Sequence, residues 1–480
     1  MGNLFSRNRK MQIPSTLGEL KSSGWESVPV KEELRRNLVE RIRNGDSLFS
    51  GVHGYEETVM PQLENAILAG HDVIFLGERG QAKTRLIRGL IELLDEWMPI
   101  VEGSEINDDP YSPVSKQAKD LVNELGQNTP IEWVHRNVRY GEKLATPDTS
   151  IADLIGEVDP IKVAEGRYLS DELTLHYGLV PRTNRGLFAI NELPDLAERI
   201  QVGLLNVLEE RDIQIRGYKI RLPLDVVLFA SANPEDYTNR GRIITPLKDR
   251  FGSQIRTHYP TEPEIEMDIV EQEASIPSVG ELEVNVPNFM TRVIAVLTHE
   301  ARNSPHLNQR SGVSVRMSVT NQEAMVANSV RRALKNKEKE AVPRISDLNA
   351  LIAATAGKVE IESLDEDRDS EIVNQLLNEA VLNVFRDLVP TELHQPIVEA
   401  FDNLEGISTG EDVISDDYES VVNSDLPALK PAVQAVLEGS NSNGSAMTAS
   451  AVELILEGLH LSKRLNKYSS GARASYAARK

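Results

Sequence analysis

The fold of this chain is decided by one segment, Asp72-Val73-Ile74-Phe75-Leu76-Gly77-Glu78-Arg79-Gly80-Gln81-Ala82-Lys83-Thr84. Its apolar first half predicts a buried strand, and the glycines that follow predict a turn into a helix. Such a turn points backbone N–H groups and a helix N-terminus at phosphate groups. The spacing from Gly77 to Lys83 and Thr84 fits the P-loop pattern, in which the lysine meets the β- and γ-phosphates and the threonine meets Mg²⁺. The segment therefore predicts a site for a nucleoside triphosphate.

Ala82 departs from this pattern, which has glycine just before the lysine. The loop then carries a Cβ atom near the phosphates. An ordinary connection between a strand and a helix is the alternative interpretation of this segment, and the rest of the chain disfavours it. The residues that we expect to hold the nucleotide, ATP, are Gly77, Glu78, Arg79, Gly80, Gln81, Ala82, Lys83, Thr84 and Arg85.

The composition is typical of a globular protein. With 480 residues, of which 40% are hydrophobic and 26% charged, the chain can bury a full core and is long enough for about three domains. It has no cysteine, which excludes disulfides, iron–sulfur clusters and thiolate zinc sites. Its 52 basic and 74 acidic residues give a net charge of −22, which disfavours nucleic acid as a partner.

The apolar residues are spread along the chain rather than gathered in one long run. No stretch of 18 uninterrupted apolar residues exists, so we expect no membrane span. The first residues lack the apolar core of a secretory signal. We therefore expect a cytoplasmic protein.

Two further apolar runs predict strands of the same sheet. Residues 186–190 and 225–230 are short and nearly continuous, as expected of parallel strands covered on both faces. Helices are predicted over residues 31–42, over residues 60–68 and after Thr84. The helix after Thr84 is expected to bury one stripe, made of Leu86, Leu90, Leu93, Leu94 and Trp97. This pattern predicts an α/β nucleotide-binding core.

Polar residues follow both runs, at the carboxyl ends of strands, where open α/β sheets place their chemistry. Glu192 is placed to orient and deprotonate an attacking water, and Asn191 to hold a water of the Mg²⁺ shell through its amide oxygen. Asn233, at the end of the second run, is placed to bond a γ-phosphate or the attacking water. The alternative is that Asn191 or Asp195 caps a helix predicted over residues 196–210.

The order of these segments resembles the AAA+ ATPases. A Walker A loop lies at residues 77–84, a Walker B strand ends in Asn191-Glu192, sensor one is Asn233, and an arginine finger lies within residues 247–251. Within these proteins the chain is similar to the MoxR and magnesium-chelatase subunit I branch, and its Gly-Gln-Ala-Lys-Thr loop is similar to the Gly-x-Ala-Lys-Thr loop of MoxR proteins. The resemblance implies a P-loop AAA+ parallel-sheet core with a helical lid and an additional, mostly α-helical C-terminal region.

Two segments between the Walker motifs and sensor one support this branch. Residues 148–186 resemble its insertion in helix two. Residues 212–221 alternate around a central glycine, which predicts a hairpin where the branch carries one before sensor one. The resemblance spans roughly residues 45–335, and its specificity lies in the ordered set of motifs.

The resemblance implies a role for each matching residue. Lys83 binds phosphate, Thr84 and Asn191 hold Mg²⁺, and the catalytic set is Glu192, Asn233 as sensor one, Arg250 as arginine finger and Arg316 as sensor two. A finger acts on the nucleotide of the neighbouring subunit, which implies a homo-oligomeric ring, a hexamer. Arg240 and Arg242 are rival fingers, and surface or interdomain salt bridges are the alternative roles of Arg250 and Arg316.

Asn191 is the main departure from the family, because the family has aspartate beside the catalytic glutamate. An amide keeps a hydrogen bond but loses the negative charge that organises Mg²⁺. We therefore expect ATP to bind and its hydrolysis to be slow.

The resemblance and the composition divide the chain into four parts: a leader (1–44), an AAA+ core with the helix-two insert and the hairpin (45–260), a helical lid (261–358) and an acidic helical extension (359–480). The extension contains a flexible linker and ends in a basic tail. Its acidic charges predict solvated surface, or alternatively a docking surface for a basic partner. The tail is a candidate to contact an acidic surface on a neighbouring subunit.

These observations favour an ATP-driven ring of MoxR or magnesium-chelatase type that remodels or matures a partner protein. Three alternatives stay open: magnesium-chelatase subunit I itself in porphyrin metallation, a nucleotide-gated scaffold with little hydrolysis, and, least favoured, an enhancer-dependent transcription activator. The activator lacks support because the chain has no Gly-Ala-Phe-Thr-Gly-Ala loop. No Asp-x-Ser-x-Ser pattern is present, so an integrin-like (VWA) domain would come from a separate partner protein.

Overall fold

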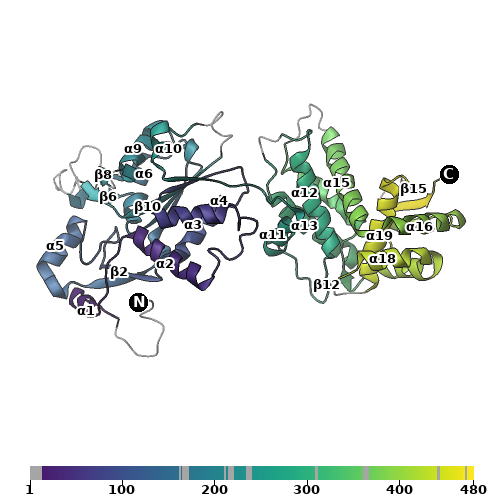
Figure 1. The fold of residues 1–480 in the computed structure, drawn as a ribbon, viewed down its shortest axis with the longest axis horizontal. Helices are drawn as coiled ribbons and strands as arrows, with labels where there is room; N and C mark the ends of the chain where they lie inside the picture. Colours follow the sequence, from purple (N-terminus) through teal and green to yellow (C-terminus); the bar gives the residue numbers. More distant parts are fainter. Residues whose placement is uncertain are drawn as a thin grey trace. The chain divides into compact units, whose positions relative to one another are not determined.

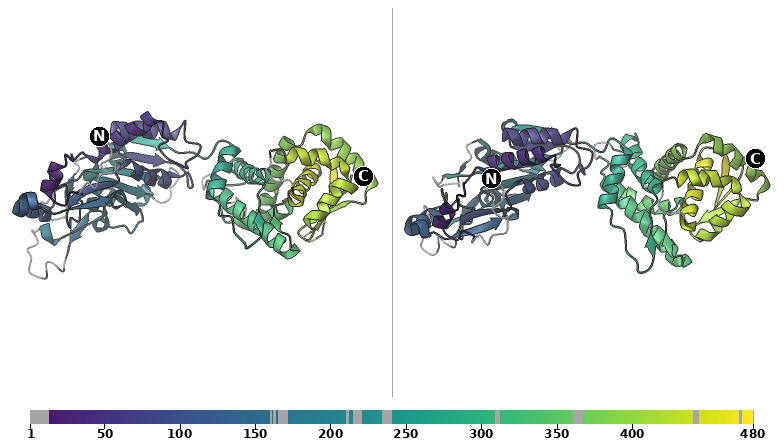
Figure 2. Two further views of the ribbon diagram at one scale, coloured as in Figure 1. Left: turned by 90° about the horizontal axis from the view of Figure 1, so that it is seen from below. Right: turned by 60° about the horizontal axis from the view of Figure 1, so that its bottom comes forward.

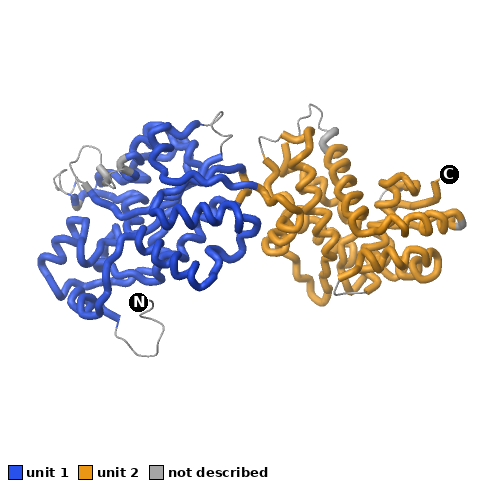
Figure 3. Tube along the Cα trace, viewed as in Figure 1, with its two compact units in different colours: residues 1–78, 82–258 blue, residues 79–81, 259–480 orange. Residues whose placement is uncertain are grey.

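The structure is a computed structural model that describes residues 13–159, 161, 164, 172–209, 212–214, 221–233, 241–308, 312–360, 367–439, 444–470 and 473–479. The chain forms two compact units (Figure 3). The first consists of Met1–Glu78 and Ala82–His258, and the second of Arg79–Gln81 and Tyr259–Lys480.

A five-stranded sheet forms the centre of the first unit (Figure 1). Its strands lie in the order β11-β1-β10-β7-β4, and every adjacent pair is parallel. The strands are β1 (Val73–Leu76), β4 (Tyr140–Leu144), β7 (Gly186–Asn191), β10 (Val226–Ala232) and β11 (Ser253–Arg256). The three apolar runs of the sequence are the three central strands, which confirms the predicted parallel α/β core.

Both faces of this sheet are buried. The helices of the unit are α1 (Leu17–Ser22), α2 (Val30–Asn44), α3 (Val59–Ala69), α4 (Lys83–Gly89), α5 (Lys116–Leu125), α6 (Ile151–Leu154), α8 (Leu179–Arg182), α9 (Glu198–Glu209) and α10 (Thr245–Arg250). Val73 and Phe75 pack into one core with α2, α3 and α4, whereas Ile74 and Leu76 pack into another with α9 and α10. Alternate residues of a strand point to opposite faces, so two buried faces require a continuous apolar run.

The segment after the P-loop helix differs from the prediction at Trp97. Helix α4 ends at Gly89, a 3-10 turn covers Leu90–Leu93, and Trp97 begins strand β2 (Trp97–Val101). This strand pairs antiparallel with β3 (Ile131–His135), outside the central sheet. The Trp97 side chain is 40% exposed, so its assignment to the buried helical stripe was wrong: the leucines fill the core, and the chain then leaves the helix.

Two further antiparallel pairs of strands lie outside the central sheet of the first unit. Strand β5 (Gly156–Val158) pairs with β6 (Leu175–Tyr177) within the predicted helix-two insert. Strand β8 (Asp212–Gln214) pairs with β9 (Arg221–Pro223), which confirms the predicted hairpin, although its residues 215–220 lie outside the described part of the chain.

The second unit is mainly helical. Its helices are α11 (Pro263–Glu273), α12 (Asn288–Asn303), α13 (Arg316–Asn336), α14 (Leu351–Ala356), α15 (Asp367–Leu388), α16 (His394–Ala400), α17 (Ser415–Ser420), α18 (Lys430–Val436) and α19 (Ser445–Leu461). Side chains of α12, α13, α15 and α19 share one apolar core. None of the helices in the described residues is long and apolar enough to cross a membrane.

The C-terminal segment, yellow in Figure 2, adds a small antiparallel sheet to this unit. Its strands are β14 (Ile407–Gly410), β15 (Leu465–Ser470) and β16 (Arg473–Ala478), in the order β14-β16-β15. Two cations of the basic tail pair within the unit: Lys467 Nζ lies 2.7 Å from Glu457 and Arg473 Nε lies 2.5 Å from Asp412. Lys467 and Arg473 of the tail therefore form ion pairs with acidic residues of their own unit.

A buried ion pair attaches helix α2 to the core of the first unit. Arg139 donates from Nη1 and Nη2 to the two carboxylate oxygens of Glu33, at 2.7 and 2.5 Å. Both side chains are almost fully buried, with 1% and 5% exposed. The backbone N–H of Asp95 also donates to Glu33 at 2.7 Å. Removing one partner leaves an uncompensated buried charge.

We predict that Glu33→Ala lowers the free energy of unfolding of the first unit by about 3 kcal/mol. All three tryptophans, Trp25, Trp97 and Trp133, belong to this unit, so tryptophan fluorescence in urea reports its unfolding specifically. The matched control is Glu32→Ala, whose exposed pair with Arg35 contributes less than about 1 kcal/mol. Equal losses of unfolding free energy in the two variants would contradict a stabilising role for the buried pair of Glu33 and Arg139.

Candidate functional site

The P-loop connects β1 to α4 at the carboxyl edge of the central sheet. The backbone N–H of Gly77 donates to the carbonyl of Ala232 at 3.1 Å, so the start of the loop is tied to the end of the neighbouring strand β10. Gly80 has a φ of 76° and Ala82 a φ of 52°. The loop therefore turns through left-handed conformations before α4 begins, and Ala82 holds one of them in spite of its Cβ atom.

Lys83 is the first residue of α4 and is 7% exposed. Its Nζ donates to the carbonyl oxygens of Gly77 and Glu78, each at 2.6 Å. The ammonium group is therefore held at the carbonyls of the loop itself. A buried positive charge interacts with an anion more strongly than an exposed one, because little water screens it. The role of Lys83 in phosphate binding stays a prediction.

Thr84 and Asn191 meet although 107 positions separate them in the sequence. The hydroxyl of Thr84 lies 3.4 Å from Oδ1 of Asn191, the last residue of β7. Ser231 of β10 donates to the same Oδ1 at 3.1 Å and accepts from the backbone N–H of Glu192 at 3.2 Å. Ser231 was not among the expected site residues. Its place two positions before Asn233, on a strand end, was the only sequence signal for it.

The pair of Thr84 and Asn191 fits Mg²⁺. Both offer oxygen atoms, the ligand type that this ion prefers, and neighbouring oxygens of an octahedral site with bonds of about 2.1 Å lie about 3 Å apart. The observed separation of 3.4 Å is close to that value. Within the described residues, no group of three or more histidine, aspartate and glutamate side chains is placed to hold a metal ion. An ion at this pair would take further ligands from water and phosphate.

Glu192 follows β7 with a φ of 55°, a conformation that side chains with a Cβ seldom adopt. Ala82 and Glu192 are thus left-handed residues on two sides of the same site. Such backbone strain persists where the surrounding structure over-determines it, often at functional sites. Helix α9 begins at Glu198, so neither Asn191 nor Asp195 immediately precedes it, and the capping alternative was wrong.

Asn233 follows β10 directly and is buried, with 4% exposed. Because Gly77 bonds to the preceding residue, Ala232, the structure brings Asn233 beside the start of the P-loop. The site therefore combines a loop, β7 and β10 at one edge of the sheet. The specific role of Asn233 stays a prediction.

Glu142 of β4 is a site residue that the sequence did not reveal. Its Oε1 accepts from Nδ2 of Asn191 at 2.6 Å. Arg88 of α4 donates to both carboxylate oxygens, at 2.8 and 3.0 Å. No motif surrounds Glu142 in the sequence, and only the parallel pairing of β4 with β7 places its carboxylate at Asn191.

The predicted arginines lie on elements other than those that carry this cluster. Arg250 ends α10 and donates to the carbonyl of Pro246 at 2.9 Å. Its rival Arg242 is 78% exposed and lies 3.7 Å from Glu198, while Arg240 falls outside the described residues. Arg316 begins α13 in the second unit and is exposed. Their roles in catalysis remain predictions.

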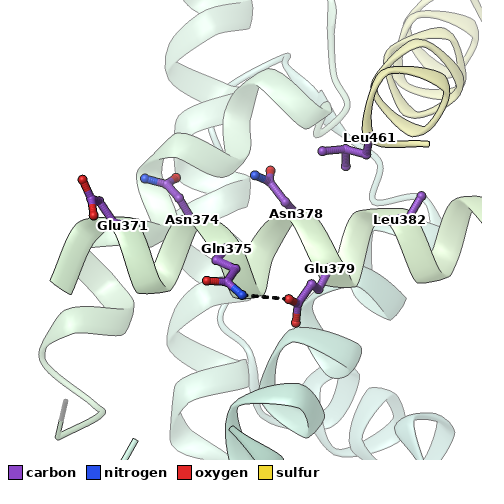
Figure 4. A pocket seen from close by; sticks show the side chains of 7 residues that line it. All are labelled: Glu371, Asn374, Gln375, Asn378, Glu379, Leu382 and Leu461. Carbon is purple, nitrogen blue, oxygen red and sulfur yellow. Dashed lines mark hydrogen bonds between the residues drawn. The ribbon is translucent and has the colours of Figure 1, made fainter. Parts of the chain in front are cut away.

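A groove in the second unit, with a volume of about 410 Å³, has a different chemistry (Figure 4). Its lining residues carry two carboxylates and no basic side chain: Glu371, Asn374, Gln375, Asn378, Glu379, Leu382 and Leu461. Without a positive charge or a helix N-terminus it does not suit a triphosphate. The P-loop is the better nucleotide site.

Comparison with known proteins finds similar chains among the magnesium-chelatase subunits. No family model matches the chain. The magnesium-chelatase subunit ChlI of Nostoc sp. is 29% identical over 252 residues, which are 51% of this chain and 61% of that protein. The same subunit of Nephroselmis olivacea is 30% identical over 244 residues, 47% of this chain and 61% of that protein. These similarities support an AAA+ ATPase of the magnesium-chelatase branch.

The chain thus spans about three fifths of the length of these curated relatives. A solved complex of the BchI and BchD subunits of magnesium chelatase is also similar, at 19% identity and a TM-score of 0.35, covering 67% of this chain and 97% of that one. The similarity to the magnesium-chelatase subunits ChlI supports the family resemblance that the motif order indicates.

We predict that Ala82→Gly raises the free energy of unfolding of the first unit by about 1 kcal/mol, because glycine adopts the left-handed conformation without strain. Urea unfolding followed by tryptophan fluorescence measures the change. The control is Ala152→Gly in α6, which has ordinary helical geometry and should lower the same quantity by about 1 kcal/mol. A loss in both variants would show that Ala82 carries no strain.

Proposed function

We propose that this chain binds ATP with Mg²⁺, hydrolyses it within a homo-oligomeric ring, and uses the cycle to remodel or mature a partner protein. The observation that carries the proposal is the convergence of Lys83, Thr84, Asn191 and Glu192 at one edge of the sheet. A buried ammonium, a pair of oxygen ligands and a carboxylate are the groups that phosphoryl transfer to water requires.

Each group has a distinct task. Lys83 stabilises the negative charge of the β- and γ-phosphates, and Thr84 and Asn191 hold Mg²⁺, which neutralises charge on the phosphate oxygens. Glu192 orients the attacking water and accepts its proton. Asn233 donates its amide N–H to the γ-phosphate or to that water.

The ring follows from the arginine finger. Arg250, the last residue of α10, is the residue that the family resemblance assigns to the nucleotide of a neighbouring subunit. We infer a hexamer, with Arg316 as sensor two and a client protein as substrate. A separate protein with an integrin-like (VWA) domain is the partner that we expect to couple the ring to this client.

Two other functions are favoured by single observations. The matched relatives are named magnesium-chelatase subunits, which favours a role in porphyrin metallation. The amide at Asn191, where the family has aspartate, favours a scaffold whose bound ATP orders the ring with slow turnover. The measured rate of ATP hydrolysis distinguishes such a scaffold from the proposed ATP-hydrolysing ring.

We predict that Lys83→Gln lowers the affinity for a fluorescent ATP analogue about 100-fold, because it removes a charge-assisted hydrogen bond worth up to about 3 kcal/mol. Equilibrium fluorescence titration measures the affinity. The matched control is Lys119→Gln, an exposed lysine of α5 in the same unit, which should leave it unchanged. Unaltered binding by Lys83→Gln would refute the P-loop assignment.

We predict that Glu192→Gln lowers the rate of ATP hydrolysis at least about 100-fold while ATP still binds, because the general base is lost. Phosphate release and light scattering, each with and without ATP, give the rate and the assembly state. If the ring assembles with ATP and hydrolyses it, and Glu192→Gln abolishes this hydrolysis, the proposed ATP-hydrolysing ring is supported. If the unsubstituted protein binds ATP and assembles but does not hydrolyse it, the nucleotide-gated scaffold is the remaining function.

A further inference from the structure

The side chain of Asn191 lies between two polar groups with opposite requirements. On one side, Glu142 presents a carboxylate oxygen 2.6 Å from Nδ2. On the other side, the hydroxyls of Thr84 and Ser231 lie 3.4 and 3.1 Å from Oδ1. One amide group therefore connects the carboxylate of β4 to the threonine of the P-loop.

The partners determine which way this amide points. An ionised carboxylate can only accept hydrogen bonds, so the N–H₂ group of Asn191 must face Glu142. The opposite orientation would place the amide oxygen against the carboxylate oxygen at 2.6 Å. Glu142 thus directs the Oδ1 of Asn191 towards Thr84, where a metal ligand is needed.

The carboxylate of Glu142 is held by an ion pair and a further hydrogen bond. Arg88 binds both of its oxygens, and Tyr140 donates to Oε2 at 2.9 Å. The guanidinium of Arg88 is permanently charged, so its two hydrogen bonds to Glu142 form an ion pair.

An aspartate at position 191, the residue of the family pattern, would not fit this environment unchanged. Its carboxylate would replace the Nδ2 donor that now lies 2.6 Å from Glu142. Two carboxylates at that distance cannot both ionise freely, and one of them takes up a proton. The amide of Asn191 and the carboxylate of Glu142 are therefore a matched pair.

We propose that the carboxylate of the Mg²⁺ site has moved from β7 to β4, so that Glu142 supplies the negative charge that Asn191 lacks. Glu142 is a positioning residue: it orients Asn191 and places its charge one amide group away from the metal ligand Oδ1. This inference rests on the proposed function, in which Thr84 and Asn191 hold Mg²⁺. The departure at Asn191 is then a relocation of charge and not its loss.

The test measures metal affinity and does not depend on turnover. Mn²⁺ is titrated into the protein saturated with a fluorescent ADP analogue, and bound Mn²⁺ is read by electron paramagnetic resonance. Glu142→Gln should weaken Mn²⁺ binding about 10- to 100-fold, the range found when a group that supports a metal ligand is removed. The control Glu132→Gln, at an exposed position of β3, should leave it unchanged.

The double variant tests the exchange of charge. Asn191→Asp in the Glu142→Gln background should restore the affinity for Mn²⁺, because the pair then regains one carboxylate and one amide. In the unsubstituted background the same change should give a smaller gain in affinity, because it sets two carboxylates against each other. An equal gain in Mn²⁺ affinity in both backgrounds would show that positions 142 and 191 act independently, and it would overturn the proposal.

Arg88→Gln separates the metal role from a merely structural ion pair. It removes the partner of Glu142 but keeps its charge, so Mn²⁺ binding should stay within about threefold. A loss equal to that of Glu142→Gln would overturn the proposal. Binding of the ADP analogue in EDTA separates a failure of the proposed function from a failure of this inference. If the analogue does not bind, both are refuted. If it binds and the Mn²⁺ affinity of Glu142→Gln is unchanged, this inference alone is refuted.

Discussion

The burial of the central parallel sheet on both faces is the constraint on which the rest of the first unit depends. Alternate side chains of β1, β7 and β10 enter two separate apolar cores, so each of these strands is apolar over most of its length. Within these three strands, Asn191 and Ser231 are the polar side chains, and both lie in the last two positions of their strand. Polar groups can follow only at the strand ends, and parallel pairing brings those ends to one edge. The P-loop, the Walker B segment and Asn233 meet there for this reason.

At that edge, a few hydrogen bonds hold the backbone in conformations that it would not adopt alone. Ser231 bonds both to the side chain of Asn191 and to the backbone of Glu192, so two neighbouring residues of one strand are located from the next. Lys83 is held at the carbonyls of its own loop. The left-handed residues Ala82 and Glu192 are part of this arrangement.

The second unit is stabilised by buried charge as well as apolar contact. Arg332 and Arg344 are fully buried, and they pair with Asp347 and Glu338 at distances of 3.1 to 3.2 Å. These ion pairs connect α13 to the 3-10 segment Ile345–Ala350. Desolvation offsets much of the attraction in buried pairs of this kind, whereas removal of one partner would leave an uncompensated buried charge.

The sequence by itself determined the three central strands of the sheet, the P-loop and the order of the motifs, because apolar runs and glycine turns are local patterns. It also indicated the family resemblance and placed Lys83, Thr84, Asn191, Glu192 and Asn233 at the P-loop and at the ends of strands, while their roles stay predictions. Only the tertiary structure decided that Trp97 begins a separate strand and that Glu142 faces Asn191. The physical reason is that strand pairing joins residues 49 positions apart without leaving a periodic signal in either segment. The residue that most changes the interpretation of Asn191 was therefore visible only in the fold.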